Sequence, residues 1–254
     1  MKILVCIFHY DERTLELNKY CWNRLGFNNI KIFSSKSKFY EKLIEMANYV
    51  YNLEEKYDLI IKSDADELVF DGVHRLVEKS KKYDMSLGLF FDRLMNNWRN
   101  SGPKIYKPIV FDYIVNKKII VKDVLKPETE LGIDVKNRGL KFKTFNIPTC
   151  LHEFAQYPSK ILNVLINRYH RGHLKRLYSK NYLLNSNNFK NNELKVFNYL
   201  FNYYIKNNKI EDKKNCNYIE FQNYDKGVKK IKILELEVLR KKFKKIYKNK
   251  IKLL

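Results

Sequence analysis

The chain has 254 residues, of which 45% are hydrophobic, and a formal net charge of +22 at pH 7. This length allows one large domain or one domain with appendages, and the hydrophobic content is ample for a core. No run of 18 or more apolar residues is present, so no transmembrane helix is expected. The apolar residues 1–8 are followed at once by charged residues without a small-residue cleavage site, which predicts a first core strand and not a signal peptide.

The positive charge is unevenly distributed along the chain. Residues 1–100 contain 16 Lys and Arg against 15 Asp and Glu, whereas residues 101–254 contain 34 against 13. The second part would therefore attract polyanions such as nucleic acid, anionic lipid headgroups or phosphorylated donors. The chain is also rich in Lys, Asn, Ile and Tyr and poor in Ala and Gly, a bias typical of AT-rich genomes that raises Lys content without selection for binding. Both explanations of the charge stay open at this stage.

Strand and helix patterns alternate through the first ninety residues. Strands are predicted at residues 2–9, 29–35, 57–63 and 85–91, and helices at residues 14–25, 39–53 and 71–82. Such alternation predicts an α/β fold with a mixed, mostly parallel sheet that is flanked by helices. Ligands of such sheets bind at the carboxyl ends of the strands.

The pattern changes after residue 100. Short strands are predicted at residues 105–111, 117–124 and 139–148, and a loop at residues 127–139. Helical periodicity returns from residue 159, and residues 227–254 have the pattern of a basic amphipathic helix. We therefore expect one α/β domain over residues 1–180 and a basic helical C-terminal extension over residues 181–254.

Two carboxylates follow directly after the buried strand predicted at residues 57–63. Asp64 and Asp66 are two positions apart at the point where the chain leaves the sheet, so both side chains can converge on one point. Two carboxylates held close together repel each other unless a positive group lies between them. A divalent cation with oxygen ligands, Mg²⁺ or Mn²⁺, would satisfy this requirement and could then bind a diphosphate.

Three segments together resemble a known family: residues 3–13, residues 59–70 and the segment around His152. They look like a GT-A glycosyltransferase of the family 2-like type, and the resemblance covers roughly residues 1–180. Its most specific piece is residues 62–68, Lys-Ser-Asp-Ala-Asp-Glu-Leu. The resemblance implies a Rossmann-like sheet and a metal-dependent transfer of sugar from a UDP- or GDP-linked donor to an acceptor hydroxyl.

The resemblance also implies roles for individual residues. Asp66 would ligate Mn²⁺ or Mg²⁺ directly, Asp64 would contact the metal, a metal-bound water or the ribose, and His152 would complete the metal shell or bind the diphosphate. The segment after the first strand is similar to the loop that holds the nucleotide base in such enzymes. The residues expected to contact the nucleotide are Phe8, Tyr10, Glu12, Ser34, Ser35, Asp64 and Ala65.

An inverting glycosyltransferase needs a carboxylate base that takes the proton of the acceptor hydroxyl. The candidates are Glu153 beside His152, Asp134, and Asp92 after the strand at residues 85–91, with Glu153 preferred. The Glu-Asp motif that usually carries the base in this family is absent. Inversion and retention therefore both stay open.

The acceptor and the cellular location follow from the charge and the cysteines. The four cysteines show no metal-binding spacing, which predicts reduced thiols in a cytoplasmic protein. With a surface glycan or glycolipid as acceptor, the basic tail would lie peripherally on the anionic inner face of the membrane. With nucleic acid as acceptor, such as a modified base in viral DNA, the basic second part would follow the phosphates. A Mg²⁺-dependent nucleic-acid-processing module is a remote alternative, because residues 2–8 lack the further acidic residue that it would need.

Overall fold

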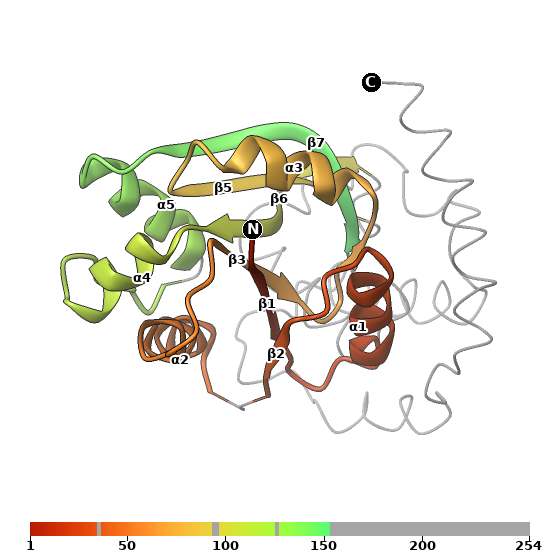
Figure 1. Ribbon diagram of the computed structural model, residues 1–254, viewed down its shortest axis with the longest axis horizontal. Coiled ribbons are helices and arrows are strands. Elements are labelled where there is room, and N and C mark those ends of the chain that lie inside the picture. Colours follow the sequence, from red (N-terminus) through yellow and green to blue (C-terminus); the bar gives the residue numbers. More distant parts are fainter. Residues whose placement is uncertain (35–36, 93–96, 125–126, 153–254) are drawn as a thin grey trace, which may run out of the picture. The chain divides into compact units, whose positions relative to one another are not determined.

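The computed structural model describes residues 1–34, 37–92, 97–124 and 127–152 (Figure 1). Within these residues the strands are β1 (Ile3–Phe8), β2 (Ile30–Phe33), β3 (Leu59–Asp64), β4 (Leu68–Val69), β5 (Met85–Asp92), β6 (Asn97–Tyr106) and β7 (Phe142–His152). The helices are α1 (Leu15–Arg24), α2 (Phe39–Tyr51), α3 (Gly72–Ser80), α4 (Pro108–Val115) and α5 (Pro127–Asn137). The predicted alternation of strands and helices up to residue 92 is therefore confirmed, with ends that differ by a few residues.

All of these strands belong to one sheet with the order β2-β1-β3-β6-β5-β7-β4. Strand β1 pairs in parallel with β2 and β3, and β5 pairs in parallel with β7. Strand β6 is antiparallel to both β3 and β5, so β3 and β5 share one direction. Only β6 and β4 oppose the common direction among the strands described here. The predicted α/β class with a mixed, mostly parallel sheet is confirmed.

Helices cover both faces of the sheet (Figure 1). Because successive side chains of a strand point to opposite faces, β1 directs Leu4, Cys6 and Phe8 toward one core cluster and Val5 and Ile7 toward the other. The first cluster includes residues of α2, α4 and α5, and the second includes residues of α1 and α3. We call these the α2/α4/α5 face and the α1/α3 face.

Three predictions for residues 105–139 were wrong. The strand predicted at residues 105–111 is the end of β6 followed by helix α4, and the loop predicted at residues 127–139 contains helix α5. No strand occurs within residues 117–124. Helices α4 and α5 each begin with a proline, a residue that is favoured at the first helical position. The β-branched residues of α4 look like a strand in sequence, but Val110, Phe111 and Ile114 lie at helical spacing in the core.

The described residues belong to one compact unit, Met1–Phe154. The predicted boundary at residue 180, the helices expected from residue 159 and the basic helix at residues 227–254 lie outside the described residues. Among the helices that are described, none combines the length and the apolar character needed to cross a membrane.

Candidate functional site

The carboxyl ends of four parallel strands meet at one edge of the sheet. Phe8, the last residue of β1, is in register with Asp64, the last residue of β3. On the other side of β6, Asp92 at the end of β5 is in register with His152 at the end of β7. The strand directions therefore gather three of the predicted site residues, Asp64, Asp92 and His152, at the edge where α/β sheets bind ligands.

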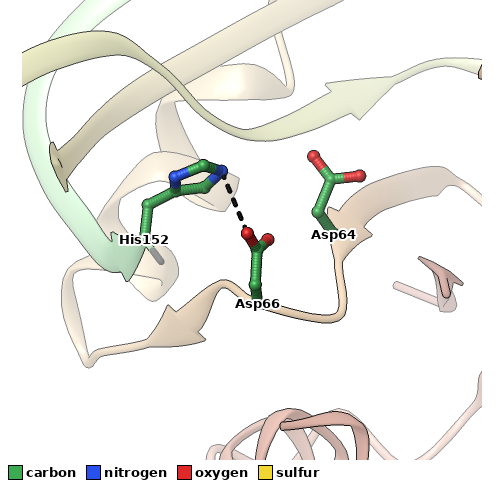
Figure 2. A group of neighbouring side chains, drawn as sticks. All are labelled: Asp64, Asp66 and His152. Atoms are coloured by element: carbon green, nitrogen blue, oxygen red, sulfur yellow. Dashed lines mark ion pairs between the residues drawn. The ribbon is translucent and has the colours of Figure 1, made fainter. Parts of the chain in front are cut away.

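The short strand β4 brings Asp66 to His152. It pairs antiparallel with β7, with Leu68 opposite Leu151, so the turn before β4 lies next to the end of β7. The Nε2 atom of His152 lies 3.5 Å from Oδ2 of Asp66. Asp64, Asp66 and His152 each offer a ligand atom, and these three atoms lie within 4.8 Å of one another. Figure 2 shows the three side chains pointing toward a common space.

Glu67 holds the turn between β3 and β4 in shape. Its Oε2 atom accepts hydrogen bonds from the backbone N–H of Asp64 and from the Ser63 hydroxyl, both at 3.0 Å. Its own N–H donates to the Asp64 carbonyl at 2.9 Å. Burial, together with the nearby charge of Asp64, raises the pKa of Glu67 to about 7. The third acidic residue of the motif therefore points inward and supports the two carboxylates that face the site.

Helix α1 fixes the same turn from the α1/α3 face, a contribution that the sequence analysis did not predict. The Nδ2 group of Asn18 donates to the Asp64 carbonyl at 3.0 Å and also contacts the Glu67 carbonyl. The Thr14 hydroxyl donates to the Ala65 carbonyl at 2.9 Å. Both side chains are fully buried. The signal in the sequence was an asparagine between apolar positions of an amphipathic helix.

The two aspartates of the cluster have opposite electrostatic surroundings. Burial alone would raise the pKa of Asp64, but the charges of Lys62 and Lys104 outweigh burial and hold this pKa below its usual value. Burial, with the charges of Asp64 and Glu12, raises the pKa of Asp66 well above its usual range. Asp64 is therefore neutralised from within the protein, whereas Asp66 faces negative neighbours.

The neutralisation of Asp64 comes from a chain of buried charges on the α2/α4/α5 face. Lys62 Nζ lies 2.7 Å from Oδ1 of Asp64 and 3.2 Å from Oε1 of Glu128, and Lys104 Nζ lies 2.7 Å from Oε2 of Glu128. Lys62 and Lys104 are 1% and 3% exposed. Glu128 was not among the predicted site residues, because residues 127–139 were expected to form a loop. The lysine within the apolar run of β3 was the available signal, because a buried lysine needs an acidic partner.

The residues expected to contact the nucleotide lie in two environments. Phe8 and Ala65 are fully buried residues, and the Ala65 N–H donates to the Phe8 carbonyl at 2.9 Å. Tyr10 and Glu12 follow β1, and the Tyr10 N–H donates to the Glu12 carboxylate. Ser34 follows β2 and its hydroxyl lies 3.2 Å from Nδ1 of His9. Ser35 lies outside the described residues.

The three candidate bases are placed differently. Asp92 is fully buried beside His152 in strand register and forms a 2.9 Å ion pair with Arg99. Asp134 lies on α5, outside the Asp64–Asp66–His152 cluster, with its Oδ2 3.6 Å from Lys122 Nζ. Glu153 follows the last described residue.

The cluster fits a divalent cation. Ligands of one octahedral Mg²⁺ lie about 3 Å apart when adjacent and about 4.2 Å apart when opposite, as follows from bond lengths near 2.1 Å. A shift of under about 1 Å would bring the three ligand atoms into this range, since all lie within 4.8 Å of one another. Two carboxylates with one imidazole suit Mn²⁺ as well as Mg²⁺.

No protein-family model matches the sequence, and no curated protein matches it. Several solved structures are similar in fold. Residues 1–349 of S. aureus TarS match with a TM-score of 0.40 and 11% identity, over 82% of this chain and 74% of that one. A nucleotide-diphospho-sugar transferase from Desulfovibrio desulfuricans matches with a TM-score of 0.37 and 12% identity, over 80% and 99%. A 4-diphosphocytidyl-2C-methyl-D-erythritol synthase from Anaerococcus prevotii matches with a TM-score of 0.43 and 9% identity, over 57% and 87%. At TM-scores below 0.5 and identities of 9–12%, these likenesses concern the fold alone.

Proposed function

We propose that this protein is a metal-dependent glycosyltransferase that moves a sugar from a UDP- or GDP-linked donor to an acceptor hydroxyl. The observation that carries the proposal is the convergence of Asp64, Asp66 and His152 at the carboxyl edge of the sheet. Two of these residues are carboxylates that repel each other in the absence of a cation. Their position is the one where an α/β sheet binds its ligand.

Each residue of the cluster has a distinct task in this proposal. Asp66 in the turn before β4 and His152 at the end of β7 would hold the cation, while Asp64 is kept in place by Lys62. A bound Mg²⁺ or Mn²⁺ supplies the positive charge that stabilises the leaving diphosphate. Tyr10 and Glu12 hold the nucleotide near this edge, and the charge of Glu12 already acts on Asp66.

The proton of the acceptor hydroxyl is the second chemical requirement if the enzyme inverts. Glu153 stays our preferred base because it follows His152 directly in sequence. Asp92 shares the same edge of the sheet, but it is fully buried and its carboxylate is engaged in an ion pair with Arg99. The assignment is tested by replacing each candidate with its amide, in turn Glu153, Asp92 and Asp134. Only the replacement of the true base should lower kcat without changing the affinity for the donor.

The acceptor class is tested separately from the donor. We propose a surface glycan or glycolipid, with nucleic acid as the alternative, on the basis of the positive charge of residues 101–254. Co-sedimentation with anionic liposomes supports the first. Retention of DNA that falls steeply as salt is raised supports the second.

The donor site is tested by a thermal-shift panel of UDP- and GDP-linked sugars with Mn²⁺ and with EDTA. A ligand at 100 times its Kd stabilises the native state by about 2.7 kcal/mol. We expect such a shift only when metal is present, and we expect Asp66→Asn to abolish it. Asp71→Asn is the matched control, because Asp71 is an exposed aspartate of the same segment without a side-chain capping bond. Equal shifts in EDTA, or an undiminished shift in Asp66→Asn, would contradict the proposal.

A further inference from the structure

Two lysines lie directly opposite each other on neighbouring strands. Lys62 of β3 is in register with Lys104 of β6, so both side chains leave the sheet on the α2/α4/α5 face. Both are buried, and Lys62 Nζ lies 4.6 Å from the centre of the Phe39 ring of α2. Like charges directly opposite each other destabilise a sheet. This pair therefore needs a common partner.

Glu128 is that partner. It is the second residue of α5, and its two carboxylate oxygens each bind one lysine, at 3.2 Å for Lys62 and 2.7 Å for Lys104. Lys62 in turn binds Asp64 at 2.7 Å. The four groups alternate in sign from Asp64 to Lys104, and their charges sum to zero. The negative end of this series is a residue of the cation cluster.

We infer that Glu128 is a positioning residue for the cation site. Its charge offsets one of the two buried lysine charges behind Asp64, so that the Asp64 carboxylate can bind a metal cation while it is paired with Lys62. The inference rests on the proposed function. Loss of the Glu128 charge would leave one uncompensated positive charge behind the cluster. That charge would repel a cation and would attract the diphosphate of a nucleotide. The two ligands should therefore respond with opposite signs.

Calorimetry on the 254-residue chain measures two affinities: that for Mn²⁺ alone, and that for UDP in the presence of EDTA. Removal of a group that supports a metal ligand typically lowers metal affinity 10- to 100-fold. We expect Glu128→Gln to raise the Kd for Mn²⁺ about 10-fold or more and to lower the Kd for UDP in EDTA. Glu130→Gln is the matched control, because Glu130 lies on the same helix and pairs with the exposed Lys122 at 3.7 Å.

A second variant separates charge from structure. Lys104→Met combined with Glu128→Gln restores a net charge of zero for the group that begins at Asp64. The affinities of this double variant for Mn²⁺ and UDP should therefore return to those of wild type. The inference is overturned if Glu128→Gln and Glu130→Gln have the same Mn²⁺ affinity. It is also overturned if Glu128→Gln weakens the binding of both Mn²⁺ and UDP, or if the double variant binds Mn²⁺ as weakly as Glu128→Gln alone. A wild-type protein that binds no Mn²⁺ overturns the proposed function, and this inference with it.

Discussion

The two faces of the sheet bury polar groups of different kinds. On the α1/α3 face most buried polar groups are neutral and hydrogen-bonded, as in Asn18, which binds the turn after β3, and Ser86, whose hydroxyl donates to Ser80 at 2.6 Å. The buried carboxylate of Glu67 on this face accepts from the Ser63 hydroxyl. On the α2/α4/α5 face the buried polar groups are charged. They include Lys62, Lys104 and Lys42, whose Nζ donates to the His9 carbonyl at 2.5 Å.

This difference indicates which face serves the site. Buried ion pairs add little net stability, because desolvation offsets most of the attraction, and apolar replacements are often as stable. Neutral hydrogen-bonded groups such as Asn18 fix a backbone shape at a lower desolvation cost. The α1/α3 face therefore shapes the turn that holds the aspartates, and the α2/α4/α5 face sets the charge around them.

The largest expected loss of stability comes from Trp22 on the α1/α3 face. Trp22 is fully buried and packs edge-to-face on Phe27. Trp22→Ala should lower the free energy of unfolding by about 3–5 kcal/mol, measured by urea denaturation. Its Mn²⁺ affinity should stay close to that of wild type, since Trp22 Nε1 forms no hydrogen bond to the turn that carries Asp64 and Asp66. A large loss of Mn²⁺ affinity in the folded variant would show that packing on this face sets the site as a whole.

Asn18, one turn before Trp22 on the same helix, should behave differently. Asn18→Leu leaves the carbonyls of Asp64 and Glu67 without this donor, and an unsatisfied buried polar group costs about 1–3 kcal/mol. The free energy of unfolding should therefore fall less than in Trp22→Ala. The Mn²⁺ affinity should fall as well, because the turn that carries Asp64 and Asp66 loosens. An Asn18→Leu protein with wild-type Mn²⁺ affinity would refute the shaping role of α1.

On the charged face, removal of a matched pair should cost little. Lys104→Met combined with Glu128→Leu removes one charge of each sign and leaves the Lys62–Asp64 pair in place. Its free energy of unfolding should lie within about 1 kcal/mol of wild type or above it, because apolar replacement of a buried pair is often neutral or stabilising. Denaturation in urea measures this. A loss of several kcal/mol would mean that these charges are retained for stability.

The smallest expected effect lies at the surface. Glu78 near the end of α3 pairs at 2.7 Å with Lys81, the residue that follows this helix, and both side chains are exposed. Glu78→Gln should change the free energy of unfolding by less than about 0.5 kcal/mol, because exposed ion pairs contribute little. A larger change in the same urea experiment would mean that surface charge dominates the stability of this basic chain. The proposed difference between the two faces would then not explain the stability of the protein.

The sequence predicted the parts of the fold and site that depend on local pattern. Alternating strand and helix signals located the elements up to Asp92, and the i, i+2 spacing after a buried strand singled out Asp64 and Asp66. Helix α4 was not predicted because its β-branched residues resemble a strand. Helix α5 was not predicted either, and Glu128, which lies in it, was therefore not recognised as a site residue. The pairing of β4 with β7 and the contacts of Asn18 join segments about 50 to 80 residues apart. Local spacing does not contain such contacts.

The most direct measurement is anomalous diffraction at the manganese edge, from crystals of the 254-residue chain grown with Mn²⁺ and UDP. We predict a single strong peak at coordinating distance from carboxylate oxygens of Asp64 and Asp66 and from Nε2 of His152, in contact with the diphosphate. A well-ordered UDP with no peak between these three side chains, or a manganese ion bound elsewhere, would contradict the metal-dependent mechanism.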